Sequence, residues 1–283
     1  MAAVIMDGKL LSEQLMNTQK ERVEALRQRG KAVTLSVVLV GEDPASQTYV
    51  RNKQRACEAL GVQGSTLRLP ADISQKELER QLDALCADDG IDGVLLQLPL
   101  PKGLDENSAL KHITPEKDVD GFHIANQGAL LSSQDGVVAC TPKGVIHMLK
   151  AYHVPLSGKH AVVVGRSTIV GKPAALLLLN ENCTVTVCHS RTEDLAAYTR
   201  QADVLVAAVG KAKMITADMV KEGAAVVDVG INRVDGKLCG DVDFDAVKEK
   251  AGYISPVPGG VGKMTVAMLM DNVIAAAEKR MKA

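Results

Sequence analysis

The stretch "VVVGRSTIVGKPAALLLL" (162–179) has the order of a buried strand, a glycine-containing turn and a helix. In a Rossmann domain this arrangement holds a pyrophosphate on backbone N–H groups at the helix N-terminus. Gly165 fits the first glycine position, Ser167 stands at the second, and the next glycine is Gly171. The match is partial, so a tight turn in an α/β domain that binds no nucleotide is the alternative.

Further strand patterns on either side extend this motif to a domain. Strand-length apolar runs occur at 159–165, 183–188, 203–210 and 224–230, and helical patterns separate the first three. Alternation of this kind is typical of a parallel sheet covered by helices. We therefore predict a Rossmann-like nucleotide-binding domain over residues 141–263.

The end of the second strand, "VCHSRT" (187–192), indicates which dinucleotide is bound. An NAD site usually has Asp or Glu there to accept from the ribose 2′-OH. This strand ends with Ser190 and Arg191 instead, and Arg166 lies in the glycine turn. A hydroxyl and two guanidinium groups suit a 2′-phosphate, so NADP is the expected cofactor. The alternative for Arg191 is an ordinary surface arginine.

Residues before 113 show the same alternation. Strands are predicted at 34–40, 64–69 and 92–98, and helices at 10–29, at 44–60 and after a capping-box pattern at 74–77. We expect two α/β domains with a cleft between them. The first covers 1–140, and the final helix, about 264–283, is expected to return to it.

Composition excludes several classes of protein. The net charge is −1 and there is no basic run of five residues, which argues against a nucleic-acid partner. The apolar run "AALLLL" (174–179) is far shorter than a membrane span, and the N-terminus lacks the pattern of a secretory signal. The six cysteines show no metal-ligand spacing, so we expect reduced thiols, no metal and a cytoplasmic location.

The stretch "TYVRNK" (48–53) places one of the four tyrosines, Tyr49, four residues before Lys53. On a helix the phenol and the amine would lie on one face, one turn apart. A surface helix with a solvated lysine is the alternative.

Taken together, several motifs resemble the bifunctional methylenetetrahydrofolate dehydrogenase/cyclohydrolase family, from near residue 4 to about 275. They are "YVRNK" (49–53), "DGVLLQLPLP" (92–101), "PEKDVDGF" (115–122), "GRSTIVGKP" (165–173) and "PVPGGVGKMT" (256–265). Lys263 departs from the family pattern, which usually has Pro there. The resemblance implies NADP-dependent oxidation of methylenetetrahydrofolate to the methenyl cation and hydrolysis to 10-formyltetrahydrofolate, by a homodimer formed through the second domain.

The resemblance also implies the site residues. The catalytic residues would be Tyr49, Lys53, Gln97 and Asp120, which also bind folate together with Pro258, Gly259 and Gly260. The cofactor-binding residues would be Gly165, Arg166, Ser167, Thr168, Gly171, Ser190, Arg191 and Ile231.

The residue types agree with this chemistry. The methenyl cation would repel an ammonium, so the site should favour a neutral amine at Lys53, which can take a proton from water and return it. We expect Gln97 to orient that lysine, Tyr49 to lie against the pterin, and Asp120 to accept from the donor edge of the pterin. Each has a structural alternative: a solvated lysine, a strand-end amide, a core tyrosine and a loop carboxylate.

Two other functions compete with this one. An NADP-dependent dehydrogenase of another small substrate would transfer hydride without hydrolysing a methenyl group. A regulatory module that senses NADP(H) would bind the nucleotide without turnover. The formation and decay of methenyltetrahydrofolate, which absorbs in the near ultraviolet, would separate all three.

Overall fold

The computed structural model describes residues 2–282, which form two compact α/β units. The three-stranded unit contains Gln14–Val138 and the chain from Val266 onward, and the six-stranded unit contains Ala139–Thr265 and the chain up to Glu13. The predicted two-domain α/β architecture is confirmed.

One part of the predicted domain assignment differs from the structure. The chain up to Glu13, assigned above to the first domain, belongs to the six-stranded unit. The cause is β1 (Val4–Ile5), which pairs in parallel with β11 (Tyr253–Ile254). A strand of two residues is too short for its periodicity to be recognised in the sequence.

The three-stranded unit has a parallel sheet in the order β3-β2-β4. Its strands are β2 (Thr34–Val40), β3 (Gln63–Leu69) and β4 (Gly93–Leu96). Its helices include α2 (Pro44–Leu60), α3 (Gln75–Ala87), α4 (Glu106–Leu110) and α5 (Ile124–Leu131). Val38, Leu78 and Leu96 are among the residues of one core beneath the sheet.

Local signals in the sequence fix the ends of α2 and α3. The Asp43 carboxylate accepts from the backbone N–H of Ser46 at 2.7 Å where α2 begins, and Gly61 ends this helix in the left-handed region at φ 75°. The Ser74 hydroxyl accepts from the backbone N–H of Glu77 at 3.2 Å, which makes Ser74 the N-cap of α3. These caps define both ends of α2 and the start of α3, the helices that connect β2 to β3 and β3 to β4.

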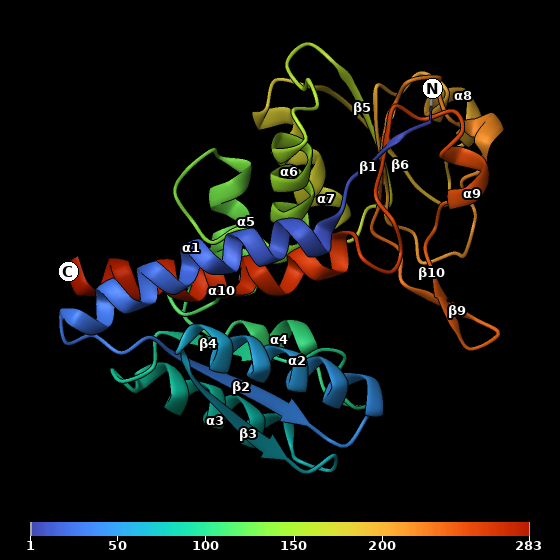
Figure 1. Ribbon diagram of the computed structural model, residues 1–283. Coiled ribbons are helices and arrows are strands. Elements are labelled where there is room, and N and C mark those ends of the chain that lie inside the picture. The colour runs from blue at the N-terminus through green and yellow to red at the C-terminus, as the bar shows by residue number, and fades with distance from the viewer. Residues whose placement is uncertain (1, 283) are drawn as a thin grey trace. The chain divides into compact units, whose positions relative to one another are not determined.

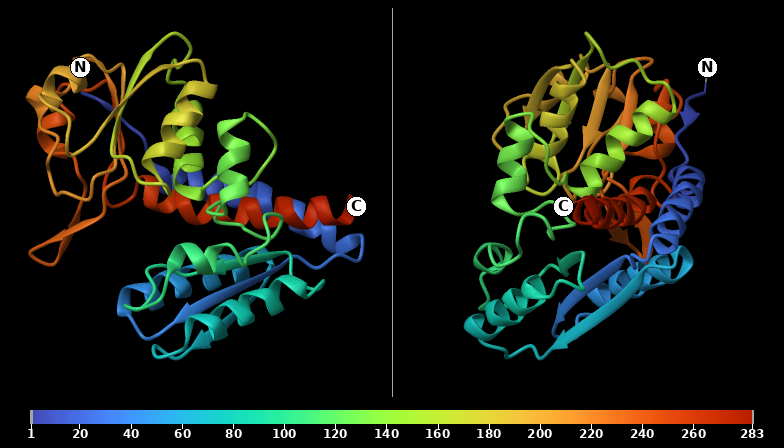
Figure 2. Two further views of the ribbon diagram at one scale, coloured as in Figure 1. Left: turned by 180° about the vertical axis from the view of Figure 1, so that it is seen from behind. Right: turned by 90° about the vertical axis from the view of Figure 1, so that its left-hand side faces the viewer.

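The final helix, α10 (Val261–Lys282), lies beside α1 (Gly8–Gln28) in Figures 1 and 2. The Arg22 guanidinium donates to both carboxylate oxygens of Glu278, at 2.9 and 2.8 Å, and also binds Asp271. The Gln19 amide donates to the carbonyl of Ala267 at 2.8 Å. From Val266 onward α10 is therefore part of the three-stranded unit.

The six-stranded unit has a parallel sheet in the order β1-β11-β8-β7-β5-β6. Its central strands are β5 (His160–Val164), β6 (Thr184–Cys188), β7 (Val204–Ala207) and β8 (Ala225–Asp228). Figure 1 shows α6 (Cys140–Ala151) and α7 (Gly171–Asn180) on one side of this sheet, and α8 (Leu195–Thr199) and α9 (Phe244–Val247) on the other.

The remaining elements of this unit are η1 (Ala217–Met219) and the hairpin of β9 (Asn232–Val234) and β10 (Lys237–Cys239). Among residues 2–282, no helix combines the length and the apolar character needed to cross a membrane.

Candidate functional site

Lys53 and Gln97 are in direct contact. Gln97 directly follows β4, and its backbone N–H donates to the carbonyl of Val38 at 2.9 Å, which continues the sheet ladder. Its side chain is buried and donates from Nε2 to the carbonyl of Leu98 at 2.7 Å, so Oε1 is left to accept from Lys53 Nζ at 3.1 Å. The strand therefore holds the Gln97 amide in place, and that amide holds the Lys53 amine.

Tyr49 lies on α2 one turn before Lys53, and the residue is 45% exposed. Residues four apart on a helix are neighbours on one face. Because nearly half of Tyr49 is accessible, its ring can contact a planar ligand. The alternative of a core tyrosine does not agree with this exposure.

Asp120 lies in a loop that is organised by a second aspartate, Asp118. The buried Asp118 carboxylate accepts from the backbone N–H groups of Gly121 at 3.1 Å and His123 at 2.8 Å, and from Asn126 Nδ2 at 2.8 Å. Sequence analysis missed this role. An Asp that bonds to backbone groups a few residues ahead is a common turn device, and its position before Gly121 was the available signal.

The remaining folate-site residues of the prediction, Pro258, Gly259 and Gly260, belong to the six-stranded unit. They directly precede α10, and Gly259 has a φ of 109°, which favours glycine. The structure thus places Tyr49, Lys53, Gln97 and Asp120 in one unit and these three residues in the other.

The predicted phosphate-binding turn connects β5 to α7. Gly165 has a φ of 130°, and a Cβ there would collide with the carbonyl of Ala208. A Cβ on Gly171 would collide with the carbonyl of Gly165, so both glycines are needed for close packing. The Ser167 hydroxyl accepts from the backbone N–H groups of Val170 and Gly171, both at 3.2 Å, which explains a serine at the usual second glycine. Thr168, in the same turn, is exposed.

The residues expected to bind a 2′-phosphate end neighbouring strands. Val164 of β5 pairs with Cys188 of β6. Arg166 comes two residues after Val164 and Ser190 two residues after Cys188, so the two side chains follow neighbouring strand ends. Arg166, Ser190 and Arg191 are all exposed at this carboxyl edge of the sheet. Ile231, three residues beyond β8, is 52% exposed. Ligands of α/β sheets bind at this edge.

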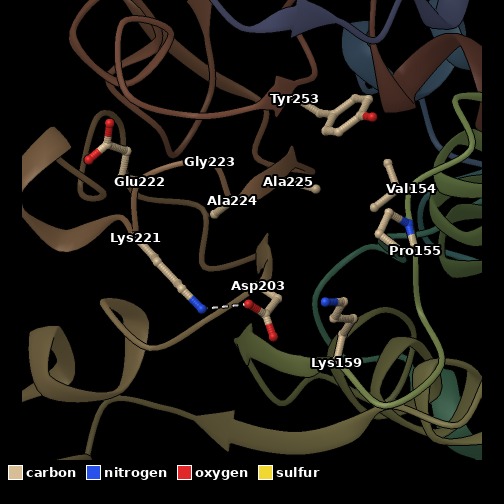
Figure 3. Close-up of a pocket in the computed structure, with 10 residues that line it drawn as sticks. All are labelled: Val154, Pro155, Lys159, Asp203, Lys221, Glu222, Gly223, Ala224, Ala225 and Tyr253. Atoms are coloured by element: carbon tan, nitrogen blue, oxygen red, sulfur yellow. Dashed lines mark hydrogen bonds and ion pairs between the residues drawn. The ribbon is translucent and has the colours of Figure 1, made fainter. Parts of the chain in front are cut away.

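A cavity in the six-stranded unit, shown in Figure 3, lies at the opposite edge of the sheet, next to the residues where β5, β7, β8 and β11 begin. Lys221 Nζ donates to Asp203 Oδ1 at 2.6 Å in its wall, and this bond holds the pKa of Asp203 below its usual value. The cavity contains none of the predicted site residues, and we do not assign it to the catalytic chemistry.

Within the part of the chain that the structure describes, no group of three His, Cys, Asp or Glu side chains is placed to hold a metal ion. One unit has a glycine turn between a strand of a parallel sheet and the N-terminus of a helix, and the other carries a lysine–glutamine pair. This is the arrangement of a two-domain α/β dehydrogenase. The catalytic-domain model of the tetrahydrofolate dehydrogenase/cyclohydrolase family matches residues 6–120, and its NAD(P)-binding-domain model matches residues 139–281. The chain belongs to this family.

Individual relatives agree along almost the whole chain. Bifunctional protein FolD of Paraburkholderia xenovorans is 57% identical over 280 residues, covering 99% of this chain and 98% of the relative. A crystal structure of the bifunctional FolD from Campylobacter jejuni superposes with a TM-score of 0.97 at 48% identity, covering 99% of this chain and 100% of that one.

A Trypanosoma brucei methylenetetrahydrofolate dehydrogenase-cyclohydrolase was crystallised with NADP cofactor and an inhibitor. It is 38% identical to this chain with a TM-score of 0.95, and the match covers 100% of both chains. The family resemblance seen in the sequence is confirmed.

Proposed function

We propose that the contact between Lys53 and Gln97 is the centre of a folate-converting site. The chain is an NADP-dependent methylenetetrahydrofolate dehydrogenase and methenyltetrahydrofolate cyclohydrolase. The residue roles below are our inference, and the observation that carries them is the 3.1 Å hydrogen bond from the Lys53 amine to the Gln97 amide.

For the dehydrogenase step, NADP⁺ supplies the acceptor of the hydride that leaves the one-carbon bridge of the folate. The chain contributes binding groups. The turn from Gly165 to Gly171 can accommodate a pyrophosphate at the N-terminus of α7, because its two glycines allow the backbone to pack closely there. Arg166, Ser190 and Arg191 would bind the 2′-phosphate by charge-assisted hydrogen bonds.

For the cyclohydrolase step, water attacks the methenyl carbon and loses a proton to the neutral amine of Lys53. The resulting tetrahedral adduct then breaks one carbon–nitrogen bond as its hydroxyl becomes the formyl carbonyl. The ammonium of Lys53 gives its proton to the departing nitrogen, and the hydroxyl proton leaves to solvent. One water is consumed and 10-formyltetrahydrofolate is released. Gln97 supports this cycle because its amide oxygen can accept from the lysine in both protonation states.

Two further residues would hold the folate. Tyr49 offers an accessible ring that can lie against the pterin and a hydroxyl that can hydrogen-bond to it. Asp120 would accept from the donor edge of the pterin, and Asp118 would keep the loop of Asp120 in place through its three hydrogen bonds. The folate-binding role of Pro258, Gly259 and Gly260 stays a prediction from the family resemblance.

We further propose a homodimer formed through the six-stranded unit. Val234 and Leu238 of the β9–β10 hairpin are 49% and 41% exposed, and exposed apolar side chains on a hairpin suit a protein partner. Light scattering of the chain and of Leu238→Glu tests this proposal, since the substitution should yield monomers. An unmodified chain that is already monomeric would contradict it.

Optical assays test the activities directly. The chain is mixed with methylenetetrahydrofolate and NADP⁺, and the methenyl absorbance should rise and then decay. Methenyltetrahydrofolate supplied alone should decay faster with the chain than without it. Hydride transfer without accelerated decay would indicate a dehydrogenase only, and nucleotide binding without either change would indicate a regulatory module.

A further inference from the structure

Two aspartates in the six-stranded unit are buried although neither belongs to the predicted site. Asp228 ends β8 and is 3% exposed, and Asp241 follows β10 and is fully buried. Burying a carboxylate is costly unless hydrogen bonds replace its hydration. The hydrogen-bond partners of these two side chains therefore indicate their structural role.

Asp241 binds a turn and a loop at once. Its carboxylate accepts from three consecutive backbone N–H groups, those of Val209 at 2.6 Å, Gly210 at 3.0 Å and Lys211 at 2.8 Å. It also accepts from Asn232 Nδ2 at 2.9 Å. The first group is the turn directly beyond β7, and the second is the start of β9, so one side chain joins two segments at the carboxyl edge of the sheet.

Asp228 in turn holds Asp241. Its carboxylate accepts from the backbone N–H groups of Gly230, Asp241 and Val242, each at 2.9 Å. Gly230 and Gly240 allow this close packing, because a Cβ on Gly230 would collide with the Asp241 carboxylate and a Cβ on Gly240 with that of Asp228. The two carboxylates thus form one connected network.

The network reaches the predicted cofactor residues on two sides. The Ala208 carbonyl, one residue before the turn that Asp241 holds, is the atom against which Gly165 packs. Ile231 lies between Gly230, which Asp228 holds, and Asn232, which Asp241 holds. A displacement of either segment would move the surface on which the phosphate turn rests or the side chain of Ile231.

We propose that Asp241 and Asp228 are positioning residues for NADP, which fix the turn of residues 208–211 and the loop of residues 229–232 around the cofactor. This inference rests on the cofactor site proposed above. The two aspartates touch neither phosphate nor nicotinamide in this arrangement. They act through the backbone of the segments that line the site.

The test compares NADP⁺ binding, measured by calorimetry, in the full chain and in Asp241→Asn, Asp228→Asn and the control Asp245→Asn. Asparagine offers one acceptor oxygen, and its amide N–H groups oppose the backbone donors. We expect the Kd for NADP⁺ to rise about 10- to 100-fold in the first two variants, as small misplacements of binding groups do. Asp245 is exposed and bonds to Lys248, so its variant should bind like the unmodified chain.

Hydrolysis of methenyltetrahydrofolate without NADP⁺ separates positioning from general damage. It should stay near the unmodified rate, while amide exchange at Gly210 and Lys211 accelerates in Asp241→Asn. Unchanged NADP⁺ affinity in both variants, or parallel loss of affinity, hydrolysis and melting temperature, would overturn the inference. If Asp241→Asn does not fold, Asp228→Asn decides by the same readouts. Absent NADP⁺ binding by the unmodified chain would instead contradict the proposed function.

Discussion

The amine of Lys53 donates a hydrogen bond of 3.1 Å to the amide oxygen of Gln97, and that amide is held by its own bond of 2.7 Å to the carbonyl of Leu98. A lysine that is fully solvated makes no hydrogen bond to a buried amide at the end of a strand. The contact joins a helix residue to a residue that directly follows a strand, 44 positions away in the chain. The contact agrees with a positioned lysine, and the catalytic role of Lys53 stays a prediction.

We predict that Lys53→Met reduces cyclohydrolase activity by at least about 10²–10⁴-fold, the range typical of general acid–base groups. Hydride transfer needs aligned rings but no proton carrier, so dehydrogenase activity should fall less and methenyl product should accumulate. Following both absorbance changes gives the two rates, and Lys76→Met, an exposed lysine on α3, is the control.

A thermal melt checks that the Lys53 variant still folds. A normal melt with both activities retained would show that Lys53 is a solvated lysine. Joint loss of both activities and of folate binding would assign it to substrate positioning, and the base would have to be another group.

We predict that cofactor choice depends on the charged residues at the ends of β5 and β6. Arg166→Ala should weaken NADP⁺ binding far more than NAD⁺ binding, because it removes charge-assisted bonds to the 2′-phosphate worth about 1.5–3 kcal/mol. Calorimetric titration with both nucleotides measures the difference, and NAD⁺ serves as the internal control. Equal losses for the two nucleotides would contradict the assignment of Arg166 to the phosphate.

The sequence predicted the elements that local signals define. The strand at 34–40 and the helix at 44–60 have the predicted ends, because the strand is a mostly apolar run and the helix has a capping Asp43 and a terminal Gly61. The strands β1 and β11 were missed, since two residues carry no periodicity and their pairing joins residues about 250 positions apart.

Sequence reasoning proposed site residues by motif but did not single out the buried aspartates that we propose to support them. In the sequence, Asp118 and Asp241 look like ordinary loop carboxylates, and Asp228 lies in a predicted strand. Their role depends on burial and on bonds to backbone groups, in part more than 30 positions away along the chain. Burial and the distant bonds cannot be recognised from residue type and spacing in a single sequence. Only the local turn of Asp118 left a signal, the glycine at position 121.

The loop of Asp120 provides another test. Asp118→Asn should raise the KM for methenyltetrahydrofolate, by up to about 10²-fold if the loop shifts by an ångström, because the amide cannot accept from all three donors. NADP⁺ affinity, measured in the same preparation, should stay unchanged. The exposed Asp72→Asn is the control. A normal KM would show that the loop keeps its shape without this carboxylate.

The last prediction concerns the pH dependence of stability. Burial raises the pKa of Asp228 from 3.8 to about 6, although three backbone N–H groups oppose this shift. Between about pH 4 and pH 6 the folded chain therefore holds a proton that the unfolded chain has lost, and stability contributed by this group falls as pH rises through the window. At about 1.4 kcal/mol per pKa unit, the loss amounts to at most about 3 kcal/mol.

Denaturant unfolding without nucleotide, from pH 4 to pH 7, should show this fall in the unmodified chain and in Asp245→Asn but not in Asp228→Asn. Parallel pH profiles for all three proteins would mean that the Asp228 carboxyl titrates in the folded chain as it does in the unfolded one.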